Sequence, residues 1–233
     1  MTGRRNRRQA RDVSAISHPW PATAAEAIDL QKRLAPLVET VGQPAKVTRI
    51  AGVDVAFPGG GDVTRAAVAV VSFPDLEVVE AAVLEQPTRF PYVPGLLTFR
   101  EAPAVLALLE SLKTAPDLLM VDGQGMAHPR RIGIASHVGL LTGIPTIGAA
   151  KSRLIGTHDE PGPDRGSRTP LLHGGEVVGT VLRTRTGVRP LYVSIGHRLS
   201  LEAAVEWVLA CAPRFRLPEP TRLADKLSKG QDI

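Results

Sequence analysis

The chain has 233 residues with one cysteine, and 43% of the residues are hydrophobic and 22% charged. This length suits one domain with a full hydrophobic core, and no apolar run approaches the roughly 20 residues of a membrane-spanning helix. A lone cysteine excludes a disulfide bond within the chain and fits a reducing cytoplasm, which is the expected location of the protein.

The N-terminal segment is the most basic part of the sequence. Residues 1–11 contain five arginines and no acid, which accounts for the whole net charge of +5. We expect residues 1–22 to form a disordered arm, which either contacts phosphates or only increases solubility, because neither role needs a defined structure. Residues 23–233 are predicted to form a single domain, since the sequence shows neither an internal repeat nor a linker.

The first part of this domain is predicted to contain a helix and three antiparallel strands. Thr23 and Glu26 have the spacing of a capping box, and apolar residues then follow at helical spacing until Gly42 and Pro44 end the helix. Runs rich in branched apolar residues predict strands, and the short turns between them predict antiparallel pairing. These strands are expected at residues 47–57, 63–73 and 77–85.

The remaining sequence predicts helices that alternate with further strands. Pro103 is tolerated in a helix if it lies in the first turn, which places Glu101 at the helix start. Helices are expected at residues 100–112, 132–141, 200–211 and 218–228, strands at 117–121, 145–150 and 191–195, a polar loop at 156–169 and a hairpin at 171–182. This order predicts an α/β fold with a mixed central sheet flanked by helices.

Three acids stand in positions that suggest chemistry. Asp54 lies between apolar residues of the first predicted strand, Asp122 directly follows the strand at 117–121, and Glu101 begins a helix. Metal-dependent cleavage of a phosphodiester needs carboxylates that converge on one point. Each acid also has an ordinary structural explanation. Asp54 could lie on the exposed face of its strand, and Asp122 could belong to a common Asp-Gly turn. Glu101 could simply interact with the positive dipole end of its helix.

Basic residues follow two of the predicted strands. His128, Arg130 and Arg131 lie in a glycine-rich turn, and Lys151 follows the strand at 145–150. Such groups suit contacts with phosphates or base edges, and an ammonium at a strand end can stabilise charge on a scissile phosphate. A solvated basic turn and a surface lysine are the alternatives.

Several motifs occur together in one order: GVDVAF at 52–57, PYVPG at 91–95, FRE at 99–101, VDGQGMAHPRRIGIASHVG at 121–139, GAAKS at 148–152, SIGHR at 194–198 and LPEPTRLAD at 217–225. The run resembles endonuclease V over roughly residues 24–226. The resemblance implies a ribonuclease H-like fold and a magnesium- or manganese-dependent cut at the second phosphodiester bond 3′ to deoxyinosine in DNA, or to inosine in RNA. It also implies that the protein binds an inosine-containing strand of DNA, or alternatively of RNA. We expect the protein to be a monomer that does not associate with a membrane.

The same resemblance implies roles for individual residues. Asp54, Asp122 and Asp225 match metal ligands, although Asp225 stands where family members carry His or Asp. Glu101 and Lys151 match the remaining catalytic residues. Tyr92 resembles a wedge that separates strands, for which a buried core cluster is the alternative. Positions expected around the inosine pocket are Gly95, Leu97, His128, Gly133 and Ile134.

Two features depart from the pattern of the family that the chain resembles. Gln124 stands where relatives often have His, so the contact made by this side chain differs, and the N-terminal arm has no counterpart in the motif pattern.

The motifs also leave other functions to be compared. Another ribonuclease H-like, structure-specific nuclease would keep the carboxylates without needing PYVP or the base pocket. A non-catalytic binder would bind inosine strands equally well with and without Mg²⁺. The motifs do not separate DNA from RNA, because a contact with the 2′-hydroxyl cannot be read from them.

Overall fold

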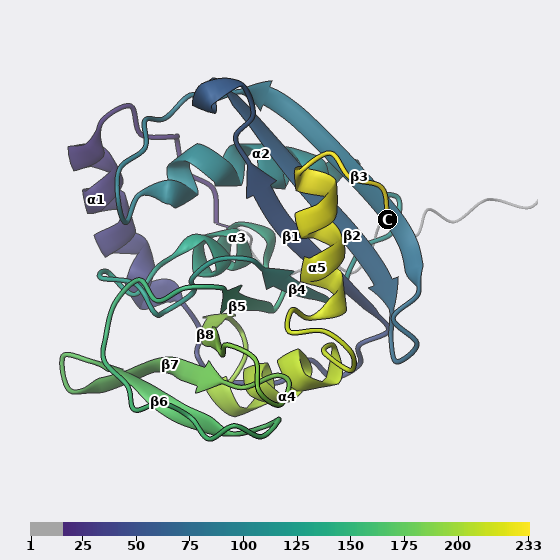
Figure 1. The fold of residues 1–233 in the computed structure, drawn as a ribbon. Helices are drawn as coiled ribbons and strands as arrows, with labels where there is room; N and C mark the ends of the chain where they lie inside the picture. The colour runs from purple at the N-terminus through teal and green to yellow at the C-terminus, as the bar shows by residue number, and fades with distance from the viewer. Residues whose placement is uncertain (1–15) are drawn as a thin grey trace, which may run out of the picture.

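The computed structural model describes residues 16–233 (Figure 1). Its elements follow the predicted order, with most boundaries within a few residues of those expected. In chain order, they are α1 (Ala24–Leu34), β1 (Arg49–Ala56), β2 (Val63–Ser72), β3 (Val78–Pro87), α2 (Leu97–Ser111), β4 (Leu118–Val121), α3 (Ile134–Thr142), β5 (Thr146–Ala150), β6 (Arg168–His173), β7 (Glu176–Leu182), β8 (Leu191–His197), α4 (Leu201–Ala210) and α5 (Glu219–Ser228).

The strands of the described region form an eight-stranded sheet in the order β3-β2-β1-β4-β5-β8-β7-β6. β1, β4 and β5 run parallel to one another, and the other neighbouring strands pair antiparallel. The antiparallel meander of β1 to β3 and the hairpin of β6 and β7 are confirmed. The expected mixed α/β, ribonuclease H-like fold is therefore confirmed as well.

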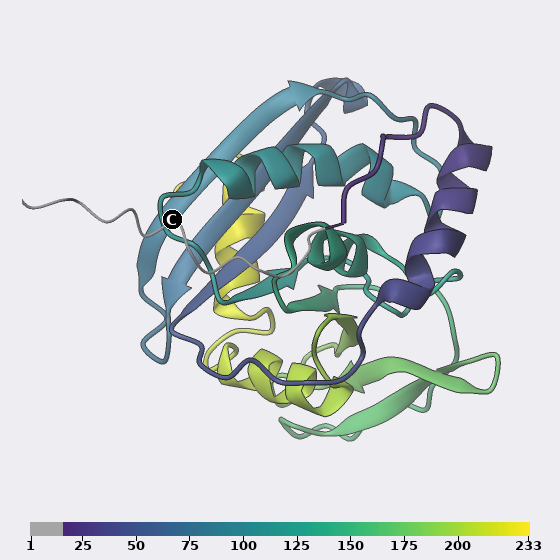
Figure 2. The same cartoon turned by 180° about the vertical axis from the view of Figure 1, so that it is seen from behind.

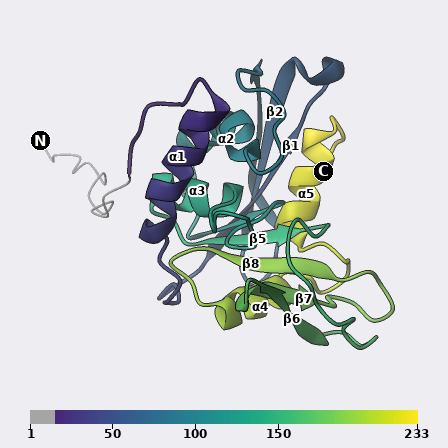
Figure 3. The same ribbon diagram turned by 90° about the vertical axis from the view of Figure 1, so that its left-hand side faces the viewer.

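Helices cover both faces of the central strands (Figures 1 and 2). Ile50 and Leu118 pack with residues of α4 and α5, whereas their neighbours Ala51 and Leu119 pack with residues of α2 and α3. Side chains alternate between the two faces of a strand, so β1 and β4 are buried on both sides. Figure 3 shows α1 outside α2 and α3, where its apolar stripe joins a third cluster with Phe99 and Ile132.

The start of α1 is as predicted, but its end is not. The Oγ1 of Thr23 accepts from the Glu26 amide at 3.2 Å, and Glu26 accepts in turn from the Thr23 amide, which completes the capping box. The prediction that the helix reaches Gly42 is wrong, since α1 ends at Leu34 and a short 3₁₀ turn follows at Ala35–Leu37. Pro36 has no N–H to donate, so the hydrogen-bond ladder of the helix cannot continue through it.

The prediction for the start of α2 is also wrong. The helix begins at Leu97, so Pro103 lies inside it and Glu101 lies in its second turn. A turn closed by the Leu96 amide and the Val93 carbonyl, 2.9 Å apart, begins the helix early. Pro103 leaves the Phe99 carbonyl without its usual helical donor. Burial of most of the helix face compensates for this loss, because packing commonly outweighs local preference.

The predicted N-terminal arm falls into two parts. Residues 1–15 lie outside the described residues. Residues 16–22, called the strap below, lie against the folded core, where the Ile16 amide donates to the Leu140 carbonyl at 3.3 Å. Throughout residues 16–233, no helix is both long and apolar enough to span a membrane.

Candidate active site

Asp54 and Asp122 lie side by side at the carboxyl ends of two parallel strands. Val53 of β1 pairs with Val121 of β4, and the Asp122 amide donates to the Val53 carbonyl at 2.9 Å. Ile50 and Gly52 face the α5 side of the sheet, so strand alternation directs Asp54 to the same side. The register of the sheet, rather than sequence proximity, therefore brings these two carboxylates together.

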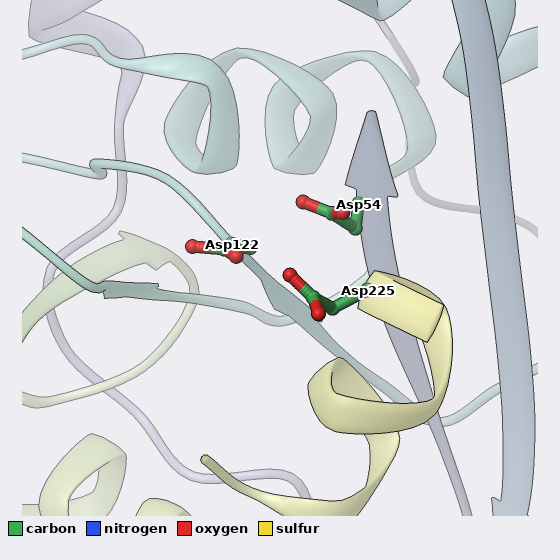
Figure 4. A group of neighbouring side chains, drawn as sticks. All are labelled: Asp54, Asp122 and Asp225. Atoms are coloured by element: carbon green, nitrogen blue, oxygen red, sulfur yellow. The ribbon is translucent and has the colours of Figure 1, made fainter. Parts of the chain in front are cut away.

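Helix α5 brings a third carboxylate, Asp225. At Gly52, a side chain would collide with the backbone of Pro220, so the absence of one lets α5 approach β1 closely. Ser228, one turn after Asp225, donates to Oδ2 of Asp54 at 2.5 Å. One oxygen from each of Asp54, Asp122 and Asp225 lies within 4.8 Å of the others (Figure 4).

The ammonium of Lys151, at the end of β5, forms ion pairs with both Asp122 and Asp225. Burial opposes its charged form, but the negative charge of Asp122 and the hydrogen bonds to both acids raise the pKa of Lys151 above its usual range. Lys229 also donates to Asp225 at 2.8 Å. Carboxylate oxygens concentrated in this way attract a cation, and an all-oxygen set suits a hard divalent ion such as Mg²⁺. The residues therefore fit a metal site.

Two of the carboxyl groups are shifted toward their neutral forms. Burial and the charge of Asp122 raise the pKa of Asp54 to about 6. Burial, followed by the charges of Asp54 and Asp122, raises the pKa of Glu101 to about 8. Glu101 is not among the three acids whose oxygens lie within 4.8 Å of one another. The charges of Asp54 and Asp122 nevertheless contribute to its raised pKa, so Glu101 belongs to the same electrostatic environment.

A cavity of about 380 Å³ opens beside the carboxylates. Among the residues predicted for the site, ten line this cavity: Asp54, Tyr92, Gly95, Leu97, Glu101, Asp122, His128, Gly133, Ile134 and Lys151. Asp225 does not line it and instead forms an ion pair with Lys151, which does. The structure thus places the predicted acids and the predicted base pocket next to one another.

Arg130, which was expected to bind substrate, supports the wall of the cavity from behind. Its Nη2 donates to the Gly95 carbonyl at 2.7 Å, and its Nε donates to Gln31 at 2.5 Å. His128 Nε2 lies 2.9 Å from the same carbonyl. Burial lowers the pKa of His128 to about 4, so the neutral imidazole carries its hydrogen on Nε2 and donates to Gly95. Both side chains therefore hold the loop at Gly95, whose φ of +77° favours glycine.

Two helices begin at the cavity. Leu97 is the first residue of α2, and Gly133 precedes Ile134, the first residue of α3. Neither helix has a side-chain cap at this end. The Phe99 and Ala135 amides already donate to the Leu96 and Gln124 carbonyls, but within residues 16–233 the amides of Leu97 and Ile134 have no partner. These amides lie at the positive dipole ends of the helices, so they can donate to a ligand. The cavity thus combines free backbone donors with carboxylates nearby.

Other residues of the site were not predicted. Gln31, Thr98, Gly123 and residues 152–154 also line the cavity, and Ser228 bonds Asp54. Gln124, noted above only as a departure, donates to the Ser152 carbonyl at 2.9 Å, and its buried Oε1 has no partner among residues 16–233. Thr98 and Ser228 carry no charge and occupy ordinary helical positions, so the sequence held no signal for them.

Known proteins resemble this chain over nearly its whole length. A family model described as Endonuclease V matches residues 32–226. A protein named Endonuclease V from Trichormus variabilis is 56% identical over 215 residues, which cover 92% of this chain and 97% of that protein. One from Roseiflexus castenholzii is 55% identical, with coverages of 92% and 96%.

Solved structures agree in fold. The crystal structure of the Endonuclease V from Streptomyces avermitilis has a TM-score of 0.86 and 48% identity, covering 91% of this chain and 93% of that one. The Ciona intestinalis Endonuclease V, in complex with a 24mer DNA containing an inosine followed by a ribo-adenosine, has a TM-score of 0.77 and 28% identity. Its coverages are 88% of this chain and 96% of that one.

Proposed function

The chain belongs to the endonuclease V family, and from this premise we propose that it cuts DNA at the second phosphodiester bond 3′ to a deoxyinosine. The observation that carries the proposal is the position of the three-carboxylate cluster beside a cavity lined by two uncapped helix starts. The Ciona relative, bound to DNA that contains inosine, supports the same substrate. We further propose that residues 23–233 act as one catalytic domain, as a monomer, in the cytoplasm.

Asp54, Asp122 and Asp225 are proposed to hold Mg²⁺, for which Mn²⁺ can substitute. When bound, the ion would neutralise charge on the scissile phosphate and make a water more acidic. Glu101, beside these acids, can accept a proton from the attacking water on its carboxylate once it is ionised. Lys151 is proposed to place its ammonium next to the phosphate and to stabilise the negative charge that develops there.

The base is proposed to enter the cavity between Gly95 and Ile134. Hypoxanthine carries a carbonyl where adenine carries an amino group. The amides of Leu97 and Ile134, the first residues of α2 and α3, can donate to that carbonyl. An adenine amino group would instead place a donor against these donors. An inosine pairs poorly and is therefore turned out of the duplex at a lower cost.

A cleavage assay tests this function. Strands with one inosine, as DNA and as RNA, are compared with adenine controls in Mg²⁺ and in EDTA. We expect Mg²⁺-dependent cutting of the inosine DNA strand, no cutting of the adenine strand, and a measured ratio of DNA to RNA rates. Asp122→Asn should lower the rate by roughly 100-fold or more, since even outer partners of a metal site are worth up to that factor.

The matched control is Asp159→Asn, which changes an exposed acid in the loop before β6 and should cut normally. Two results would reject the proposal. Equal cutting of inosine and adenine strands would favour a structure-specific nuclease. Binding of inosine strands without any cutting, in Mg²⁺ or Mn²⁺, would favour a non-catalytic binder.

A further inference from the structure

A chain of hydrogen bonds leads from the strap into the cavity wall. Thr98, the second residue of α2, lines the cavity, and its Oγ1 lies 2.8 Å from Nδ1 of His137 on α3. Nε2 of His137 lies 2.7 Å from Nε2 of His18. Nδ1 of His18 lies 2.9 Å from the Pro19 carbonyl oxygen. Figure 2 shows the strap running from α3 toward the start of α1.

His137, the central residue of this series of hydrogen bonds, is surrounded by aromatic side chains. His137 is fully buried, and its ring centre lies 4.9 Å from that of His18, 5.4 Å from that of Phe99 and 5.8 Å from that of Trp20. Burial, followed by the charge of His18, lowers the pKa of His137 to about 3. The buried imidazole is therefore neutral, with one nitrogen that donates and one that accepts.

The positions of the hydrogens in this series of hydrogen bonds follow from its last member, the Pro19 carbonyl. The Pro19 carbonyl can only accept, so Nδ1 of His18 carries a hydrogen. In a neutral His18 ring with its hydrogen on Nδ1, Nε2 accepts, so Nε2 of His137 must donate to it. This leaves Nδ1 of His137 as an acceptor for the hydroxyl of Thr98. The only hydrogen of that hydroxyl is used, and Oγ1 has only lone pairs left for a further partner.

We propose that Thr98 is a specificity-determining residue of the base pocket, held by His137 and His18 as a hydrogen-bond acceptor for the N1–H of hypoxanthine. N1–H and the C6 carbonyl are neighbours on one edge of this base. The cavity is lined by an acceptor and a donor that suit these two groups. Thr98, at the start of α2, would accept from N1–H, and the amide of Ile134, at the start of α3, would donate to the C6 carbonyl. Adenine presents a lone pair at N1, which Thr98 would repel. His137 and His18 are positioning residues in this arrangement.

The inference rests on the proposed function, and binding measurements test it separately. DNA strands with one deoxyinosine or one deoxynebularine, a purine without the carbonyl and N1–H, are bound at about pH 8 with Ca²⁺ in place of Mg²⁺. Thr98→Val should weaken inosine binding about fivefold to tenfold, the worth of one neutral hydrogen bond. It should not weaken nebularine binding, because N1 of nebularine, like that of adenine, carries a lone pair and cannot donate to Thr98. Thr98→Ser keeps the hydroxyl and should restore inosine binding.

The matched control is Thr142→Val, which removes a hydroxyl from the far end of α3. It should leave both affinities unchanged. An equal loss with both strands, or no loss with inosine, in a Thr98→Val protein that melts as a folded protein would overturn the inference. If the unmodified protein itself does not prefer inosine over adenine, the proposed function fails first, so the two failures are distinguishable.

The positioning role has its own test. His18→Ala frees His137 to adopt either tautomer, so Thr98 is no longer restricted to accepting. We expect the preference for inosine over nebularine to fall about threefold or more, and the double variant with Thr98→Val to lose no more than Thr98→Val alone. Additive losses would show that His18 does not act through Thr98 and would overturn this part.

Discussion

Buried acids and histidines in and behind the lining of the cavity have pKa values shifted in opposite directions for one physical reason. Burial is the largest cause of the raised pKa values of Asp54 and Glu101 and of the lowered pKa values of His128 and His137. In each case a poorly solvated environment favours the neutral form. The acids can regain their charge beside a cation, whereas the imidazoles have no such partner and serve as neutral hydrogen-bonding groups.

These shifts predict an acid-sensitive contribution of His137 to stability. Its pKa of about 3 in the folded protein is far below the ordinary value of 6.5. Below about pH 6.5 the unfolded chain binds a proton there and the folded protein does not, so the free energy of unfolding decreases as the pH falls toward 3. Between pH 7.5 and 5.5 this single group should lower it by about 1.4 kcal/mol.

Urea unfolding in EDTA at these two pH values measures the effect. Glu101 and Asp54, with raised pKa values, contribute in the opposite direction, so the comparison must be made against a variant. His137→Asn keeps a polar atom near the position of Nδ1 but cannot take up the proton. Its loss on acidification should be smaller than that of the unmodified protein by about 1.4 kcal/mol. Equal losses would contradict the shift.

At the scale of elements, the metal site depends on how closely α5 approaches β1. Gly52→Ala would place a methyl group against the Pro220 backbone, so α5 must move outward and carry Asp225 with it. We expect a loss of about 1–3 kcal/mol in the free energy of unfolding, as for other overpacked cores. Mn²⁺ affinity, measured by calorimetry, should fall as well. Ala81→Val, on the exposed side of β3, is the matched control and should change neither.

The loop before α2 carries an exposed aromatic residue, Tyr92, beside the cavity. Tyr92 is 67% exposed at the rim of the cavity, while its neighbours Phe90 and Val93 pack inward. The alternative of a buried cluster therefore does not hold for Tyr92. Two prolines stiffen the loop, and an exposed aromatic on a stiff loop suits insertion between bases.

Tyr92→Ala should slow cutting of a duplex inosine site more than cutting of the same site in a single strand, because only the duplex must be opened. We expect about tenfold on the duplex and less than about threefold on the single strand, given a stacking worth of roughly 1–3 kcal/mol. Tyr92→Phe keeps the ring and should behave as the unmodified protein. An equal loss on both substrates would mean that Tyr92 contacts the base itself.

At the scale of the whole molecule, charge is concentrated in the N-terminal residues. Deleting residues 1–11 removes five arginines and brings the formal net charge from +5 to zero. Affinity for DNA without inosine should fall, and its dependence on salt should flatten, because fewer phosphate counterions are released. Cutting at an inosine with saturating enzyme should persist, since the strap and the cavity are retained. Inactivity under saturation would show instead that these residues belong to the active site.

The sequence by itself determined what depends on neighbours along the chain. The capping box at Thr23, the branched runs of β1 to β3 and the glycines of the β6–β7 hairpin act through local backbone preferences and alternation, so their patterns are visible without the fold. Asp54 and Asp122 were found in the same way, because an acid within or after an apolar strand is a local anomaly.

Only the tertiary structure decided what depends on packing between distant segments. Burial of α2 allowed an internal Pro103, against its local preference. The meeting of Lys151 with Asp225 depends on the approach of α5, and the bond between His18 and His137 joins residues 119 positions apart. These contacts follow from strand register and helix docking, whose free energy is summed over many buried groups. No short stretch of sequence contains that sum, so the base-reading role proposed for Thr98 has no signature in its own motif.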